Sequence, residues 1–323
     1  MSGYGYLNMY GNITGSSAAP LNALVYGGLT LGRDNDFSGT ITLETNAYLQ
    51  VGSDTALGNA TLITKSGATI YNIWSDRILA NAVTTNGGTV NLYSESNSLT
   101  FGGPITLASP ATIDVWGAGP VVISGSISES GGSQGISAAG TGMLVLNGSV
   151  GITGGVSVNN GLVIIGSSAA VPASGTVGVY GDGYLGLDMA TGITATQFIS
   201  RLDPASSGTI GFDTATLSAP SSISDPIDVS GFSGNPRLGS ATSAVLAGTI
   251  TPGGSGYSFG GGGGTLQVAS NLTGSNDVNL YSPYSQSLTL ILSGTNTYSG
   301  RTYIANSLLR FANSNALPNF AEN

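Results

Sequence analysis

Residues 90–94 read VNLYS and residues 113–117 read IDVWG, and these two segments share the pattern that decides the fold. Each begins with a β-branched residue, has an aliphatic residue two positions later, and ends with an aromatic residue followed by Ser or Gly. Close variants occur as ALVYG at 23–27, VGVYG at 177–181 and VNLYS at 278–282. Alternation with a period of two is typical of a short β-strand with one buried face. The chain is therefore expected to be built from many similar strands.

The spacing of the aromatic residues gives the length of the repeat. Aromatic residues recur at a nearly constant step, at Tyr4, Tyr26, Tyr48, Tyr71, Tyr93 and Trp116. Short strands that recur at such a step, with Gly, Asn and Ser between them, are typical of a solenoid in which each strand pairs with its copy one coil later. We therefore predict an all-β fold, a right-handed parallel β-helix (β-solenoid) with a coil length of about 22 residues.

The low content of charged residues and the lack of a long apolar run limit the kinds of partner that the chain can bind. Charged residues make up 7% of the 323 residues, with seven Lys and Arg, sixteen Asp and Glu, and a net charge of −9. The few bases are scattered, so we expect no nucleic-acid partner. No apolar run is long enough for a membrane-spanning helix, so we expect no membrane insertion by this segment. The start, residues 1–11, lacks the basic and apolar regions of a signal peptide, and none is expected.

A longer repeat contains the strongest family signal. Residues 140–172 and 287–318 align without a gap, matching Gly148 with Gly294 and Pro172 with Pro318. Both segments resemble the autotransporter-associated β-strand repeat, and LTLILSGTNTYSG at 288–300 is close to a consensus copy. The resemblance implies a passenger-type β-helix that is secreted to, or displayed on, the cell surface of a Gram-negative bacterium.

The repeat pattern divides the chain into three segments. We predict β-helix coils over 1–190 and again over 264–323. Between them, 191–263 contains five prolines and a glycine run, and we interpret it as an irregular module or a set of altered coils on the solenoid. Within it, TATQFISRLD at 194–203 predicts a short helix with Phe198, Ile199 and Leu202 on one face.

The residue types exclude most catalytic chemistry. The chain has no His and no Cys, so the usual nucleophilic triads and zinc sites are excluded. Five acidic residues are spaced about one coil length apart in the sequence, namely Asp34, Asp54, Asp76, Glu95 and Asp114. Their positions relative to the aromatic residues drift from coil to coil, so we interpret them as solvated turn residues and not as a calcium-binding column. We predict no metal, no cofactor and no enzymatic activity.

The aromatic residues form the candidate contact site. Strand alternation turns the ring outward when the aliphatic residues face inward. The predicted contact stripe consists of Tyr26, Tyr48, Tyr71, Tyr93 and Trp116. Exposed rings one coil apart can contact a sugar, a partner protein or another copy of the chain. In the alternative interpretation, the rings only stack on one another and stiffen the outer face.

These features favour a structural or adhesive extracellular surface protein. Its rigid solenoid would present a repetitive contact face. Because uncapped coils expose unpaired backbone groups, we expect either end-to-end association of the terminal coils or, in the native protein, further coils beyond both termini. The expected partners are other copies, end to end or laterally, or other cell-surface components, including glycans. The alternative is a carbohydrate-binding or carbohydrate-cleaving β-helix protein, which an acidic cluster beside Arg or Lys on adjacent coils would favour.

Overall fold

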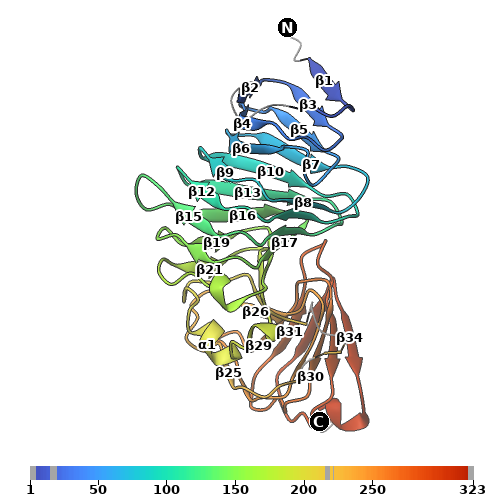
Figure 1. Ribbon diagram of the computed structural model, residues 1–323. Helices are drawn as coiled ribbons and strands as arrows, with labels where there is room; N and C mark the ends of the chain where they lie inside the picture. The colour runs from blue at the N-terminus through green and yellow to red at the C-terminus, as the bar shows by residue number, and fades with distance from the viewer. Residues whose placement is uncertain (1–4, 15–19, 215–218, 221, 319–323) are drawn as a thin grey trace. The chain divides into compact units, whose positions relative to one another are not determined.

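A computed structural model describes residues 5–14, 20–214, 219–220 and 222–318. Tyr4, one of the predicted repeat positions, lies outside the described residues. The chain forms two compact units by its contacts. The first contains Met1–Ser157 and Ala169–Gly175, and the second contains Val158–Ser168 and Thr176–Asn323. In both units, strands stack with a parallel register (Figure 1), which confirms the predicted all-β solenoid.

The first unit has three parallel sheets, each built from one strand per coil. The first sheet contains β1 (Tyr6–Met9), β3 (Gly28–Leu31), β5 (Tyr48–Val51), β7 (Ala68–Asn72), β10 (Gly88–Tyr93), β13 (Ala111–Trp116) and β16 (Ile136–Gly140). The second contains β2 (Leu21–Val25), β4 (Ser38–Leu43), β6 (Asn59–Thr64), β9 (Val83–Thr85), β12 (Ile105–Leu107), β15 (Ile127–Glu129) and β18 (Val150–Gly151). The third contains β8 (Arg77–Leu79), β11 (Leu99–Phe101), β14 (Val121–Ile123) and β17 (Met143–Leu146). The strand β19 (Val156–Val158) ends at the boundary of the unit.

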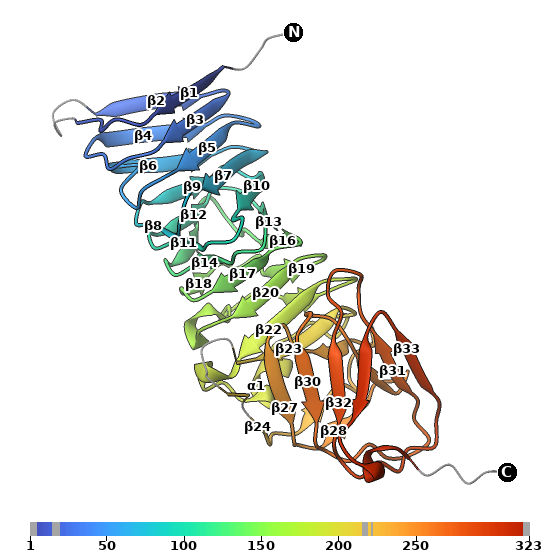
Figure 2. The same cartoon turned by 90° about the vertical axis from the view of Figure 1, so that its right-hand side faces the viewer.

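The strands of the second unit also stack in parallel, one strand per coil in each sheet (Figure 2). One contains β20 (Leu162–Ile165), β22 (Tyr184–Asp188), β23 (Thr209–Asp213), β26 (Arg237–Gly239), β29 (Tyr257–Phe259), β31 (Val278–Tyr281) and β33 (Thr302–Ala305). Another contains β24 (Ser222–Ile223), β27 (Ser243–Leu246), β30 (Thr265–Val268), β32 (Thr289–Leu292) and β34 (Leu308–Phe311). A small sheet pairs β25 (Ile227–Asp228) with β28 (Ile250–Thr251), and β21 (Val177–Val179) lies between β20 and β22 in the chain.

Stacked aliphatic side chains form the core inside the coils. In the first sheet, an inward-facing position is occupied in successive coils by buried residues, namely Leu29, Leu49, Ile70, Leu92 and Val115. Burying such a side chain contributes about 1.5–3 kcal/mol. Because each coil repeats the contribution, the solenoid is stabilised without charged groups.

The coils differ in length, and this changes the register of the outer residues. Gly28 pairs with Tyr48, and Tyr48 pairs with Thr69, so the coils on either side of β5 are shorter than the average. Ala111 pairs with Ile136, which closes a longer coil. The step inferred from the aromatic residues is therefore only an average. An aromatic residue that follows another at this step is not always stacked on it.

The described residues of 191–263 continue the parallel strand pairing. Strands β23, β26 and β29 pair in sequence within one sheet of the second unit. The predicted helix is α1 (Ala195–Ile199), whose N-cap Thr194 forms a capping box with Gln197. The side chains of Phe198, Ile199 and Leu202 are buried, as the predicted apolar face requires. Short 3₁₀ helices also occur, at Ser168–Ala170, Met189–Thr191 and Ser314–Ala316.

Candidate functional site

Three of the predicted stripe residues form one outward row. Tyr71 pairs with Tyr93, and Tyr93 pairs with Trp116, on the outer face of β7, β10 and β13. The ring centroids of Tyr71 and Tyr93 are 5.0 Å apart, and the Tyr71 hydroxyl donates to Glu95 Oε2 at 3.1 Å. Tyr93 and Trp116 are exposed. The row thus contains ring–ring contacts and also leaves aromatic surface open to solvent.

The other two predicted stripe residues are displaced from this row. Tyr48 pairs with Thr69, so it is two positions out of register with Tyr71, although their ring centroids are 6.3 Å apart. The short coil between β5 and β7 accounts for this shift. Tyr26 follows β2, a strand of a different sheet, and it is exposed there. The expectation of one continuous five-ring stripe is therefore wrong for Tyr26.

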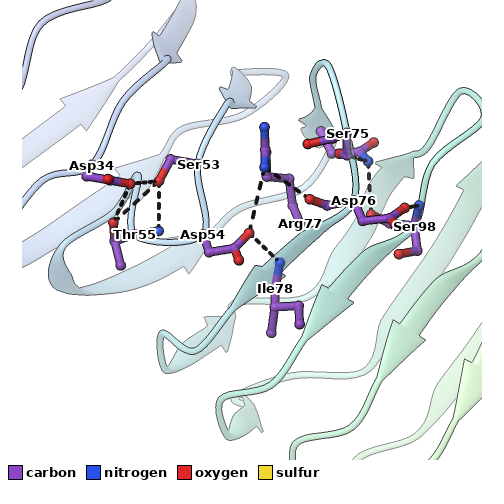
Figure 3. Close-up of polar contacts among 10 residues, drawn as sticks. Asp34, Ser53, Asp54, Thr55, Ser75, Asp76, Arg77, Ile78 and Ser98 are labelled. Carbon is purple, nitrogen blue, oxygen red and sulfur yellow. Dashed lines mark hydrogen bonds and ion pairs between the residues drawn. The ribbon is translucent and has the colours of Figure 1, made fainter.

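Asp34, Asp54 and Asp76 lie near one another on neighbouring coils, although their positions were expected to shift from coil to coil. Leu31 pairs with Val51, so Asp34 and Asp54 occupy equivalent positions three residues later. Both line a surface groove together with Arg33 and Arg77. Figure 3 shows Asp34, Asp54 and Asp76 on neighbouring coils, with Arg77 beside Asp54. The interpretation of drifting acids relied on the aromatic spacing and is wrong for Asp34 and Asp54.

Hydrogen bonds fix the carboxylates of these three acids. The hydroxyls of Ser53 and Thr55 both donate to Asp34 Oδ1, the latter at 2.8 Å. Backbone N–H groups donate to the other two acids, Ile78 to Asp54 at 3.1 Å and Ser98 to Asp76 at 2.7 Å.

The same hydrogen bonds set the protonation of two of these acids. The hydroxyl hydrogen bonds lower the pKa of Asp34, and the Ser98 backbone N–H lowers the pKa of Asp76. Both carboxylates are thus ionised at neutral pH and can only accept hydrogen bonds. Glycoside hydrolysis needs one acid with a raised pKa as proton donor. These two side chains are therefore suited to binding a hydroxylated ligand.

A buried polar cluster in the second unit was not predicted from the sequence. The Tyr184 hydroxyl donates to Asp213 Oδ2 at 2.7 Å, and both side chains are buried. Asp213 Oδ1 accepts from Ala241 N–H at 2.8 Å and from Thr242 N–H and Oγ1 at 3.0 Å each. Desolvation raises the pKa of Tyr184 well above its usual value and also raises the pKa of Asp213. With its groups buried and mutually satisfied, this cluster is an internal support and not a surface site.

Metal ligands do not cluster in the described part of the chain. Among those residues, no group of three or more Asp, Glu, His or Cys side chains is placed to hold a metal ion. We therefore expect that excess EDTA leaves the midpoint of thermal unfolding unchanged, as measured by far-UV circular dichroism. A drop of many degrees, restored by added Ca²⁺, would contradict the expectation, since a metal bound only to the folded chain stabilises it.

Comparisons of the whole chain with family models, curated proteins and solved structures find no match. None of the helices in the described residues is long and apolar enough to cross a membrane. The function must therefore be inferred from four features of the structure: the stacked coils, the terminal coils, the outward aromatic rings and the polar groove.

Proposed function

We propose that this chain is a structural or adhesive surface protein whose coils associate end to end with those of a second copy. The proposal includes a place on the exterior of a Gram-negative cell, as the resemblance to autotransporter-associated repeats implies. It treats the solenoid as a scaffold without enzymatic activity. The supporting observations are the apolar side chains that the terminal coils expose.

The N-terminal coil exposes side chains of the core type. Leu7 in β1 pairs with the buried Leu29, yet 58% of Leu7 is exposed. Tyr6 and Leu24 in the same coil are also exposed. β1 and β2 are the outermost strands of their sheets on this side. An inward-facing leucine becomes buried only when another coil, of a second copy or of a longer chain, stacks on it.

The C-terminal coil shows the same property. Ile304 in β33 pairs with the buried Leu280, yet 53% of Ile304 is exposed. Leu308 and Phe311 in β34 are exposed as well, and both strands are outermost in their sheets. Because the two edges differ, stacking one on the other is a heterologous contact, which generates open chains of molecules. This single observation, core-type residues exposed at both edges, carries the proposal.

Sedimentation velocity tests the proposal directly. We expect the unmodified chain to form larger species as its concentration rises. Leu7→Lys or Ile304→Lys is expected to shift the distribution toward the monomer, since a charge at a strand edge opposes edge-to-edge pairing. Trp116→Lys is the matched control, because Trp116 is 44% exposed but lies in β13, which pairs with β10 on one side and with β16 on the other.

Two results would contradict end-to-end association. One is a monomer at every concentration of the unmodified chain. The other is an equal effect of Trp116→Lys and the edge variants, which would indicate general apolar association. Replacing Tyr48, Tyr71 and Tyr93 together by Ser separates lateral from end contacts, because this variant leaves both edges intact.

The alternative function retains one specific support. Acids beside an arginine on adjacent coils are the arrangement expected of a carbohydrate-binding β-helix, and Asp34, Asp54 and Arg77 show it. The lowered pKa of Asp34 favours binding over cleavage in this alternative.

A further inference from the structure

Trp74 has an unusual backbone conformation for a large residue. Its φ is 73°, in the left-handed region that glycine and asparagine normally occupy. Its side chain is 61% exposed. Strain of this kind costs about 1–3 kcal/mol and is concentrated at ligand-binding sites. The chain thus holds an indole at the surface in a conformation that is unfavourable for it.

Two glycines form a shelf beneath the indole. A β-carbon at Gly52 would lie 2.6 Å from Trp74 Cζ3, and one at Gly32 would lie 3.2 Å from Cη2. Only residues without a side chain allow the ring to lie across these two coils. Tyr10 extends the surface, with its ring centroid 6.1 Å from that of Trp74 at an interplanar angle of 35°. The result is a supported aromatic platform that is open to solvent.

The same two glycines line the polar groove described above. Its other lining residues are Arg33, Asp34, Ser53, Asp54, Thr55 and Arg77. The platform and the groove therefore adjoin through Gly32 and Gly52. The cavity inside the coils of the first unit is different, because apart from Thr85 it is lined by apolar side chains. The groove thus places ionic and hydroxyl groups next to an exposed indole.

Arg77 is the best-anchored donor of the groove. Its side chain is only 14% exposed, and Nη1 donates to the Asp76 carbonyl at 3.1 Å and lies 3.9 Å from Asp54 Oδ1. Its Nε atom is buried and has no hydrogen-bond partner among the described residues. An anchored guanidinium beside carboxylates offers donors and acceptors at fixed positions, which favours a ligand rich in hydroxyl groups.

We propose that Trp74, with the groove of Asp34, Asp54 and Arg77, is a binding site for a neutral glycan. The apolar face of a pyranose ring packs on the indole, and the sugar hydroxyls bond to the carboxylates and the guanidinium. The groove lining has two carboxylates, Asp34 and Asp54, and two guanidiniums, Arg33 and Arg77, so it carries no excess positive charge to attract a polyanionic glycan. Neighbouring coils are about 4.8 Å apart, a spacing comparable to the advance per sugar in an extended glycan.

The two tryptophans of the chain make a direct test possible. In a Trp116→Phe variant, tryptophan fluorescence, excited selectively over tyrosine, reports on Trp74 alone. We expect titration with cellohexaose, xylohexaose or mannohexaose to shift and quench this emission, and calorimetry to give a Kd for the same oligosaccharide. Polygalacturonate is the anionic comparison and is expected to bind at least tenfold more weakly.

Trp74→Gly is the decisive variant, because glycine adopts a φ of 73° without strain and the fold is retained. We expect it to weaken binding at least tenfold, and Asp54→Asn to weaken it severalfold. Tyr284→Ala is the control, because Tyr284 is an exposed ring in the second unit and its replacement is expected to leave the Kd unchanged.

The proposal is overturned if none of the three neutral oligosaccharides binds, if polygalacturonate binds more tightly, or if Trp74→Gly binds as well as its parent. The site is independent of end-to-end association. Leu7→Lys is therefore expected to keep the same Kd, so failure of one proposal is distinguishable from failure of the other.

Discussion

Replacing Asp213 by alanine is expected to lower the free energy of unfolding by about 3–5 kcal/mol, because several donors around a buried carboxyl group lose this acceptor together. The Tyr184 hydroxyl, the Ala241 and Thr242 N–H groups and the Thr242 hydroxyl all donate to this carboxyl group. Alanine offers no acceptor, and Tyr184 and Asp213 are fully buried. Ala241 and Thr242 are half-buried, and Ala241 N–H also donates to the Tyr184 hydroxyl oxygen at 2.8 Å. Networks in such surroundings lose more than the sum of isolated hydrogen bonds.

Urea unfolding followed by far-UV circular dichroism measures this loss. Asp228→Ala is the matched control, because Asp228 is an exposed acid of the same unit that accepts hydrogen bonds from Ser230. The control is expected to change stability by at most about 0.5 kcal/mol. A loss below about 1 kcal/mol for Asp213→Ala would show that water or rearranged side chains satisfy the donors.

The same cluster predicts a dependence of stability on alkaline pH. Burial raises the pKa of Tyr184 well above its usual value, and the negative charge of Asp213 adds to this effect. A tyrosine in the unfolded chain ionises at about pH 10, whereas Tyr184 in the folded chain is still neutral at that pH. Its contribution is therefore complete below that pH and is lost as the pH rises further. Tyr184→Phe is expected to reduce the slope of unfolding free energy against pH in this range.

The fold could be predicted from the sequence because its signal repeats. Strand alternation in VNLYS and IDVWG is present in many copies, so a local error in one coil does not change the overall pattern. The register could not be predicted from the same spacing. Tyr26 and Tyr48 are one average step apart, yet Tyr26 follows a strand of one sheet and Tyr48 begins a strand of another. Coil length varies in the turns, and the spacing of single residues does not record where a turn is shortened.

The polar groove and the buried cluster have no periodic signal. Asp34 and Asp54 are separated by one short coil, and only the observed pairing of Leu31 with Val51 aligns them. Trp74 is of a residue type that normally avoids a positive φ, so no local pattern indicated its conformation. Asp213 gains its partners from the two neighbouring coils, about one coil length away in the sequence on either side, and no local pattern around it indicates them.

Gly148, which aligns with Gly294 in the other repeat, is required by the close packing of successive turns. Gly148 belongs to a stack of turn glycines in the first unit, together with Gly103 and Gly125. A β-carbon at Gly125 would lie 1.8 Å from the Gly103 carbonyl oxygen, and one at Gly148 would lie 1.8 Å from the Gly125 carbonyl oxygen. Each turn therefore packs directly on the backbone of the turn before it, which leaves no room for a side chain.

Gly125→Ala is expected to destabilise the chain by about 2–3 kcal/mol, since the neighbour that must move is backbone held in the coil ladder and not a flexible side chain. Gly125 N–H donates to Phe101 O at 3.0 Å, so a shift of the turn also weakens this hydrogen bond. Gly151→Ala is the matched control, because its β-carbon would meet only the Ile127 carbonyl oxygen at an ordinary 3.5 Å. For Gly151→Ala we expect no loss in the free energy of unfolding, and a gain of up to about 1 kcal/mol, because alanine reduces the entropy of the unfolded chain. Urea unfolding measures the stability of both variants. Equal stabilities would mean that the turns can move apart without cost. A loss of stability in Gly125→Ala alone would establish that close stacking of glycine turns holds the coils in register.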